Sequence, residues 1–353
     1  MAKRSRVRGL VLGAAAGVGL GIFAKRVAFA PPDSELEARA HDVQYMGPWR
    51  HGFAEANGVR LHYAEMGSGP LVILLHGFPQ CWYQWRYVMP RLAEQFHVVA
   101  VDMRGYNMSD KPTGVRAYRT DVIARDIAAL VEALGEERAH IVGHDWGGVI
   151  AWHLGMNYRE RVDRLVVINA PHPVAYRREA LKLEQLLRSY YVFLFQLPVM
   201  PEAMMRLMIR GSLPSSAAVP GAFSDEALDV YQNNISQPGA ATAMINYYRA
   251  AAREVVGLVS QDDKIIEAPT MLLWGMKDFA LVPGLTEGLD EWVPGIRVER
   301  NEESGHWVPE EKPGWVAERL REFLLVTEES AERDIADAIN AVRAEARPDE
   351  ASK

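Results

Sequence analysis

From about residue 50 onward, the sequence alternates short apolar runs with longer segments of helical periodicity. The run VRLHYAEMG predicts a half-buried strand, and the runs that follow it are more continuously apolar: LVILLHG, HVVAVDMRG, AHIVGH and RLVVINAP. Continuously apolar strands separated by helices are typical of a parallel sheet that helices cover on both faces. The sequence therefore predicts an α/β fold whose mostly parallel sheet is flanked by helices.

This alternation stops after Pro171 and resumes only with the runs APTMLLWG and IRVERNEES. Residues 173–255 carry helical, aromatic and Met-rich patches and several prolines, without strand alternation. A helical insert within an α/β frame is most simply a lid over an active site. We therefore predict a core of residues 50–172 and 256–327 and a helical lid of residues 173–255.

Residues 1–30 differ in character from the rest of the chain. The stretch MAKRSRVRG is basic, and LVLGAAAGVGLGIFA is apolar until Lys25 and Arg26. As a helix of about sixteen residues, the apolar run would span roughly 24 Å, slightly less than the ~30 Å hydrocarbon core of a bilayer. We predict a membrane anchor here. A cleavable signal peptide, suggested by AFA at 28–30, and an apolar tail without a membrane role are the alternatives.

The distribution of charge predicts where the catalytic domain lies. Basic residues are more frequent before the apolar run, whereas Asp33, Glu35 and Glu37 follow it. This bias predicts a cytoplasmic N-terminus and a periplasmic or otherwise extracytoplasmic catalytic domain. At the other end of the chain, residues 328–353 are highly charged and predict a frayed helix or a disordered tail.

Composition excludes several classes of function. The 353 residues carry a formal net charge of −7, and no basic cluster follows Arg26, which argues against a nucleic-acid partner. Cys81 is the only cysteine, so the chain forms no intramolecular disulfide and has no CxxC metal or redox motif. We expect neither a metal nor a cofactor.

The stretch VGHDWGGVI places Asp145 between Gly143 and Gly147, after an apolar strand and before a helical segment. This is the strand–turn–helix context of a nucleophile elbow, in which small residues allow the sharp turn. A carboxylate at an elbow suits attack on a saturated carbon that bears a leaving group, which gives an alkyl ester, whereas a serine attacks a carbonyl. The alternative is that Asp145 only caps the following helix.

Hydrolysis of an alkyl ester requires a histidine that activates water and an acid that orients the histidine. Asp278 in LLWGMKDFAL lies just past an apolar strand, and His306 in EESGHWVPEEKP follows the last predicted strand. Asp262 and Asp263 precede the strand and so belong to the wrong end of the sheet. A turn-forming role for Asp278 and a surface position for His306 are the simpler alternatives.

Backbone amides near the first strand-to-loop junction are candidates to stabilise the negatively charged oxygen of the reaction. The stretch HGFPQCW follows the strand LVILL, so the amide of Phe78 can face the amide of Trp146 across the site. We predict that His76, in the same loop, is a structural hydrogen-bonding residue rather than a base.

Seven short stretches together resemble the epoxide hydrolases of the α/β-hydrolase fold, especially the branch with an N-terminal membrane anchor: HGFP, DMRGY, GHDWGG, SQPGA, NYYR, LLWGMKD and GHW. The resemblance runs from about residue 50 to 326. It implies that Asp145 attacks an epoxide carbon while lid tyrosines donate a proton to the ring oxygen. Tyr248 in INYYRA matches the second of these tyrosines, and a phenol is a suitable donor to an alkoxide. Its neighbour Tyr247 cannot face the site from the adjacent helical position.

The chain departs from the family pattern at two positions. Leu194 stands where some members have the first lid tyrosine, and Tyr190, four residues earlier on the same helical face, is a candidate replacement. Gln80 stands where the family usually has Glu.

Two other functions remain possible on the sequence. A haloalkane dehalogenase would use the same triad, with Trp146 helping to hold the halide, but Phe78 and Tyr248 favour an epoxide. A membrane-tethered binding protein without catalysis is compatible with the fold alone. The apolar lid suits a small lipophilic substrate.

Overall fold

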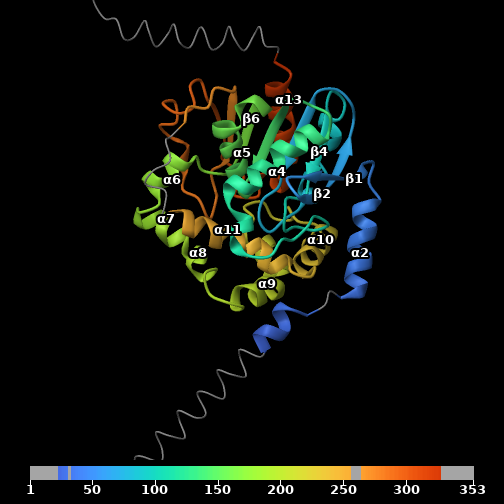
Figure 1. Cartoon of the computed structure of the whole chain (residues 1–353). Coiled ribbons are helices and arrows are strands. Elements are labelled where there is room, and N and C mark those ends of the chain that lie inside the picture. Colours follow the sequence, from blue (N-terminus) through green and yellow to red (C-terminus); the bar gives the residue numbers. More distant parts are fainter. Residues whose placement is uncertain (1–22, 31–32, 256–263, 327–353) are drawn as a thin grey trace, which may run out of the picture.

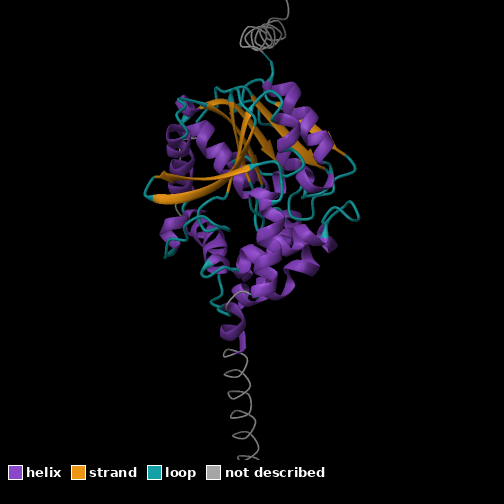
Figure 2. Cartoon of the chain, turned by 90° about the vertical axis from the view of Figure 1, so that its right-hand side faces the viewer, coloured by secondary structure: helices purple, strands orange, loops and turns teal. Residues whose placement is uncertain are grey.

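The computed structural model of the chain describes residues 23–30, 33–255 and 264–326. Its centre is a single sheet of eight strands in the order β1-β2-β4-β3-β5-β6-β7-β8 (Figure 2). The strands are β1 (Arg50–Ala56), β2 (Val59–Met66), β3 (Leu71–Leu75), β4 (His97–Val101), β5 (Ala139–His144), β6 (Val162–Ile168), β7 (Thr270–Gly275) and β8 (Arg297–Asn301).

The sheet is parallel from β4 through β8, and only β2 pairs in antiparallel fashion, with β1 on one side and β4 on the other. Every residue of β3, β5 and β7 is buried, as expected for strands that helices cover on both faces. The predicted α/β fold with a mostly parallel, helix-flanked sheet is therefore confirmed. The edge strand β1 was not predicted.

Helices cover both faces of the sheet (Figure 2). Helices α4 and α5 pack against each other, and α3 contacts α13. The helices of the described residues that have full bounds are α2 (Ser34–Tyr45), α3 (Met89–Leu92), α4 (Thr120–Ala133), α5 (Trp146–Asn157), α6 (Pro173–Glu179), α7 (Leu183–Arg188), α8 (Tyr190–Leu194), α9 (Met200–Ser216), α10 (Asp225–Ser236), α11 (Ala240–Val255), α12 (Val308–Glu311) and α13 (Pro313–Leu324).

Six of these helices, α6 to α11, lie between β6 and β7 in the sequence. They gather on the side of the sheet opposite α13 (Figure 1). Asp145 follows the carboxyl end of β5, and the aromatic contacts of Tyr248 in α11 reach Phe78 in the loop after β3 and Trp146 at the start of α5, at that same edge. The helical insert therefore covers the carboxyl edge of the sheet, where parallel α/β folds place their active sites.

The N-terminal part of the described chain packs on the lid. Residues 23–30 include a short helix, and the guanidinium of Arg206 in α9 donates to the carbonyl oxygens of Ala28 (3.0 Å) and Ala30 (2.6 Å). Helix α2 begins after Asp33, whose carboxylate caps it by accepting from the amide of Glu35 (2.9 Å).

Several predicted segments lie wholly or partly outside the described residues. Residues 1–22 hold most of the predicted anchor, 256–263 include the rejected alternatives Asp262 and Asp263, and 327–353 include the charged tail. Within the part of the chain that the structure describes, no helix is long and apolar enough to cross a bilayer.

Candidate active site

Asp145 stands on the sharp turn between β5 and α5. Its backbone has φ 51° and ψ −118°, a conformation that non-glycine residues rarely adopt. A Cβ atom at Gly143 would lie 2.2 Å from the carbonyl oxygen of Gly147, and one at Gly147 would lie 2.3 Å from that of Leu75. The two glycines are therefore required for the close approach of the turn to the sheet, as the sequence pattern predicted.

The structure brings the three predicted triad side chains together. Nε2 of His306 lies 3.5 Å from Oδ2 of Asp145, and Nδ1 of His306 lies 2.7 Å from Oδ2 of Asp278. Asp145 follows β5, Asp278 follows β7 and His306 follows β8, so all three extend from the carboxyl edge of the sheet. A carboxylate, a histidine that faces it and a second carboxylate that orients the histidine form the arrangement needed to make and hydrolyse an ester.

Asp278 is held by four hydrogen bonds. Its Oδ1 accepts from the amides of Ala280 (2.7 Å) and Leu281 (3.0 Å), and its Oδ2 accepts from Nδ2 of Asn169 (2.7 Å) as well as facing His306. Asn169 follows β6, and its Oδ1 accepts from the amide of Gly275. The sequence analysis did not identify Asn169 as an orienting residue, and its position just after a buried strand was the only signal.

The loop after β3 approaches the nucleophile. The amide of Phe78 donates to Oδ1 of Asp145 (2.7 Å), as its predicted role requires, and Trp146 begins α5 directly after Asp145. His76 is fully buried, its Nδ1 faces the carbonyl oxygen of Gly77 (3.0 Å) and its Nε2 accepts from the amide of Met103 (3.1 Å). Both ring nitrogens of His76 are thus occupied by backbone, which supports a structural role.

Burial and charge oppose each other at Asp145 and His306. Burial by itself would raise the pKa of Asp145, but the hydrogen bond and charge of His306, with the amide of Phe78, lower it overall. Burial would likewise lower the pKa of His306, but the charges and hydrogen bonds of Asp278 and Asp145 raise it to about 10. At neutral pH the site therefore holds an ionised Asp145 next to an imidazolium.

An aromatic cage lies over Asp145. The ring of Tyr248 contacts Phe78 (centroid distance 5.0 Å), Trp146 (5.1 Å), Phe195 (4.9 Å) and Tyr191 (5.8 Å), all in edge-to-face geometry. Tyr248 comes from α11, whereas Tyr191 and Phe195 come from α8 and its C-terminal cap. The cage provides an apolar surface with two hydroxyl groups.

The charge of Asp145 affects the pKa of both phenols. Burial raises the pKa of Tyr191 and of Tyr248 well above the usual value, and the negative charge of Asp145 is the next largest cause for each. Both hydroxyls therefore stay protonated at neutral pH and can donate a proton to an oxygen near Asp145.

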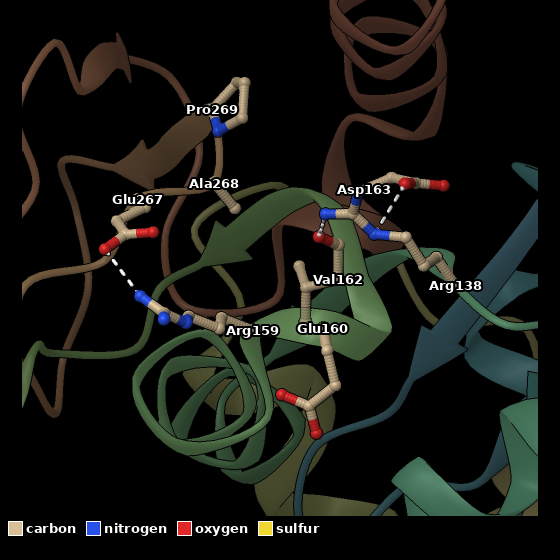
Figure 3. A pocket seen from close by; sticks show the side chains of 8 residues that line it. All are labelled: Arg138, Arg159, Glu160, Val162, Asp163, Glu267, Ala268 and Pro269. Carbon is tan, nitrogen blue, oxygen red and sulfur yellow. Dashed lines mark hydrogen bonds and ion pairs between the residues drawn. The ribbon is translucent and has the colours of Figure 1, made fainter.

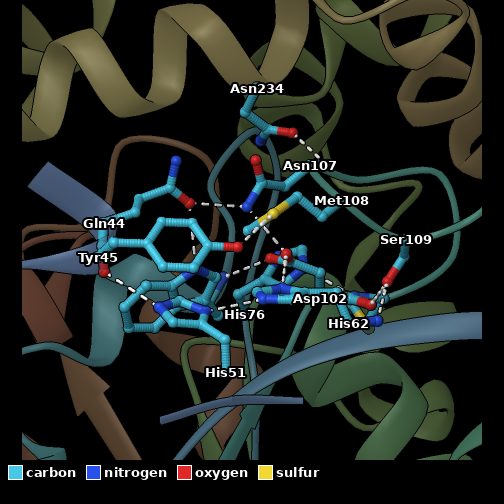
Figure 4. Close-up of polar contacts among 12 residues, drawn as sticks. Gln44, Tyr45, His51, His62, His76, Asp102, Asn107, Met108, Ser109 and Asn234 are labelled. Carbon is cyan, nitrogen blue, oxygen red and sulfur yellow. Dashed lines mark hydrogen bonds and ion pairs between the residues drawn. The ribbon is translucent and has the colours of Figure 1, made fainter. Parts of the chain in front are cut away.

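A buried polar network next to the site ties α2 to the loop after β4 (Figure 4). Asp102 accepts from Nδ2 of Asn107 (2.9 Å) and from the amide of Trp82 (2.9 Å), and it faces Nδ1 of His62 at 2.6 Å. The side-chain oxygen of Gln44 in α2 accepts from Asn107 (2.8 Å) and from the indole of Trp82 (3.1 Å). The network links the segment after β3, which carries His76 and Phe78, to the loop after β4.

A shallow groove lies at the opposite edge of the sheet (Figure 3). It is lined by residues around the start of β6 and before β7, and four of its charged side chains form two ion pairs: Arg159 with Glu267 (2.7 Å) and Arg138 with Asp163 (3.1 Å). These paired charges offer no reactive group. Within the described residues, no three His, Cys, Asp or Glu side chains gather into a metal-binding group.

Comparison with known proteins identifies the family. The family model described as alpha/beta hydrolase fold matches residues 70–313. Epoxide hydrolase 3 of Mus musculus is 39% identical over 281 residues, which cover 76% of this chain and 75% of that protein. The chain belongs to the epoxide hydrolases of the α/β-hydrolase family. The resemblance seen in the sequence motifs is thereby confirmed at the level of fold and family.

Two bacterial proteins are also similar to this epoxide hydrolase. The AB hydrolase superfamily protein YfhM of Bacillus subtilis (strain 168) is 37% identical over 279 residues, which cover 77% of this chain and 96% of that protein. The crystal structure of Bacillus megaterium epoxide hydrolase in complex with an inhibitor superimposes with a TM-score of 0.71 at 32% identity and covers 77% of this chain and 99% of that one.

The lid of this epoxide hydrolase corrects one expectation from the sequence. Tyr190, the candidate replacement for a tyrosine at Leu194, is 68% exposed and faces away from the cage. Its neighbour Tyr191 contacts Tyr248 instead. Tyr247, as predicted, does not share the position of Tyr248, because its hydroxyl donates to the carbonyl oxygen of Arg104 (2.7 Å). The second phenol of the site is therefore Tyr191.

Gln80 belongs to a buried cluster around Glu310. Its Nε2 donates to Oε1 of Glu310 (3.2 Å), which also forms a two-pronged ion pair with Arg86 (2.9 Å for both contacts) and accepts from the hydroxyl of Tyr231. A glutamate at position 80 would place a second carboxylate next to Glu310. The amide at this position therefore suits the charge of its neighbours.

Proposed function

We propose that this hydrolase opens small lipophilic epoxides to vicinal diols through an alkyl ester on Asp145. The observation that carries the proposal is the position of two protonated phenols, Tyr191 and Tyr248, in a cage over an ionised carboxylate that faces His306. A nucleophile alone would suit several leaving groups. The paired phenols favour one that leaves as an alkoxide and needs a proton.

In the first step, Oδ2 of Asp145 forms a bond with an epoxide carbon while the carbon–oxygen bond of the ring breaks. Oδ1 accepts from the amide of Phe78 at 2.7 Å, which leaves Oδ2 for the attack. The ring oxygen takes a proton from Tyr191 or Tyr248. This transfer is favourable because an alkoxide is a stronger base than a phenolate.

In the second step, His306 removes a proton from water, and the resulting hydroxide attacks Cγ of the ester. The negative charge then develops on Oδ1, where the amides of Phe78 and Trp146 are the proposed donors. Asp278 keeps Nδ1 of His306 oriented, so that Nε2 faces the ester. Collapse of the intermediate releases the diol and restores the Asp145 carboxylate, while protons return to the phenol and the alcohol.

We expect the two steps to differ in their dependence on pH. Ring opening needs ionised Asp145, whose pKa is lowered, so kcat/KM should not fall between about pH 6 and 8. Esterification removes the charge of Asp145 and hence part of what raises the pKa of His306 to about 10. Neutral His306 then forms more readily, and kcat should rise with pH where hydrolysis limits turnover.

Steady-state profiles of kcat and kcat/KM, together with mass spectrometry of the enzyme during turnover, test this difference. The ester should accumulate at low pH. A profile in which kcat/KM falls as the pH rises through the neutral range, while kcat stays constant, would contradict the proposed roles of Asp145 and His306.

A direct assay separates this function from its rivals. The wild-type enzyme should convert an aryl glycidyl ether to the diol and should release no halide from a chloroalkane or bromoalkane of similar size. A dehalogenase would use the same triad, but a departing halide has no need of two phenols. If neither class of substrate is turned over, the hypothesis of an enzyme is wrong and a non-catalytic binding role gains support.

We further propose that the apolar run within residues 10–24 anchors the protein in a membrane, with the catalytic domain on the extracytoplasmic side. The support is the sequence: four basic residues precede the run, and acidic residues from Asp33 onward follow Lys25 and Arg26. Fusion of a topology reporter to each end should report a cytoplasmic N-terminus and an extracytoplasmic C-terminus, and the reverse pattern would contradict the proposal.

A further inference from the structure

Exposed apolar side chains are concentrated on the outer face of the lid. In the described residues, eleven large apolar side chains are more than half exposed, and all but Met46 and Ile265 lie either in residues 23–30 or between residues 181 and 208. We define the lid patch as six of them: Leu183, Leu187, Tyr190, Phe193, Leu207 and Met208. Single exposed apolar residues are ordinary, but six of them on three successive helices of one insert indicate a surface that contacts something apolar.

The patch follows the geometry of three successive helices. Leu183 and Leu187 are four residues apart on α7, and Tyr190 and Phe193 are three apart on α8, so each pair shares one face of its helix. Leu207 lies on α9, where it shares an outward face with Met200, which is also exposed. Each helix therefore has an apolar stripe on its outer side, in addition to the side chains it buries.

The N-terminal segment meets the lid beside this patch. Arg206 of α9 holds residues 28–30, and Phe23 and Phe29 in the same segment are exposed. Figure 1 shows the helix of residues 23–30 directly next to α9. The apolar run proposed as the anchor immediately precedes this segment in the sequence, so the chain leads from the anchor to the patch.

Charge around the patch favours a negatively charged partner. Residues 173–216 contain six Lys and Arg and three Asp and Glu, and residues 23–30 add Lys25 and Arg26 and no acid, although the whole chain has a formal charge of −7. Two of the three acids, Glu179 and Glu202, are buried in ion pairs with Lys182 and Arg249. Basic residues around an apolar surface are typical of binding to anionic lipid.

We infer that the lid patch rests on the surface of an anionic phospholipid bilayer and inserts its apolar side chains at the headgroup boundary. This inference rests on the proposed anchor and on the proposed lipophilic substrate. The short helix α8 separates the two environments: Tyr190 and Phe193 face outward, and Tyr191 and Phe195 line the cage. An epoxide dissolved in the bilayer thus lies one helix away from Asp145.

Environment-sensitive labels on the full-length protein test the contact. Cys81 is buried, so a fluorophore attached to Phe193→Cys or Leu207→Cys reports on the lid alone. Leu325→Cys is the control, because it lies at the end of α13, which Figure 1 shows on the side of the molecule opposite α9. In vesicles of phosphatidylcholine and phosphatidylglycerol, the two lid labels should shift to the blue and be quenched by brominated lipid, and the control label should not.

Three results would overturn the inference. The first is equal quenching of lid and control labels on protein that sediments with the vesicles. This result would mean that the anchor attaches the protein to the vesicle but the lid patch does not contact the bilayer. The second is a blue shift of the lid labels in the absence of vesicles, which would mean that a second copy or residues 1–22 cover the patch. The third is a protein that does not bind the vesicles at all.

Kinetics separate failure of this inference from failure of the proposed reaction. Phe193→Glu combined with Leu207→Glu should raise the apparent KM for a vesicle-dissolved epoxide by about tenfold and leave kcat/KM for a water-soluble epoxide unchanged. The matched control, Met46→Glu with Ile265→Glu, should change neither. Equal KM values for lid and control variants would contradict docking, whereas loss of all turnover by the wild type would contradict the reaction itself.

Discussion

Replacement of His306 by Gln should trap the enzyme as an ester on Asp145. Glutamine retains a polar side chain but cannot accept the proton of the attacking water, so ring opening proceeds and hydrolysis stops. Removal of a general base costs about 10²–10⁴-fold in rate, and steady-state turnover should fall by that amount. Intact-protein mass should increase by the mass of one epoxide, and the increase should map to the peptide that contains Asp145.

The control for this experiment is the double variant with Asp145→Ala, which should show no added mass. An adduct that persists in the double variant would place the nucleophile elsewhere. Absence of an adduct in His306→Gln, in spite of a wild-type enzyme that forms diol, would mean that water attacks the epoxide directly and that no ester forms. The 3.5 Å contact between Nε2 of His306 and Oδ2 of Asp145 supports the ester, because a base at that distance faces the acyl carbon.

The sheet and the triad were accessible from the sequence because one physical rule governs both. A continuously apolar run predicts a buried parallel strand, and side chains just past its carboxyl end meet at one edge of the sheet. Asp145 and Asp278 each follow such a run, and His306 follows the partly exposed strand β8, which precedes it in the sequence, so their proximity could be inferred without knowledge of the fold. Strand β1 escaped prediction because its sequence RHGFAEA contains few apolar residues and pairs only at the edge of the sheet.

Asn169 and Tyr191 could not be predicted for different reasons. Asn169 acts through Asp278, which is 109 residues away in the sequence. An asparagine after a strand does not by itself indicate a catalytic role. Tyr191 lies on a lid whose helices are apolar both inside and outside, so periodicity does not tell which face turns toward the site. Tyr190 was chosen for its spacing of four residues from Leu194, whereas the pair with that spacing that lines the cage is Tyr191 and Phe195. The exposed stripes that obscured the orientation of the lid are those proposed to meet the membrane.

Replacement of both cage phenols should abolish ring opening while the triad remains intact. Tyr191→Phe and Tyr248→Phe each remove one donor, and we expect the rate of ester formation to fall about tenfold for each. The double variant has no donor for the alkoxide and should lose about 10²–10⁴-fold, more than the sum of the single free-energy losses if each phenol substitutes for the other. Single-turnover measurement of the ester on Asp145 reports this step separately from hydrolysis.

Two neighbouring tyrosines provide matched controls for the same substitution. Tyr190→Phe alters an exposed side chain and should leave ester formation unchanged. Tyr247→Phe removes the hydrogen bond to the carbonyl of Arg104, so it should lower the free energy of unfolding by about 1 kcal/mol without a comparable loss of ring opening. If Tyr190→Phe slowed ester formation and Tyr191→Phe did not, the assignment of the second phenol would be wrong. Because the phenols act only on the developing alkoxide, their loss should matter least for epoxides whose alkoxide leaves most easily, and that gradient distinguishes proton donation from a simple packing role of the cage.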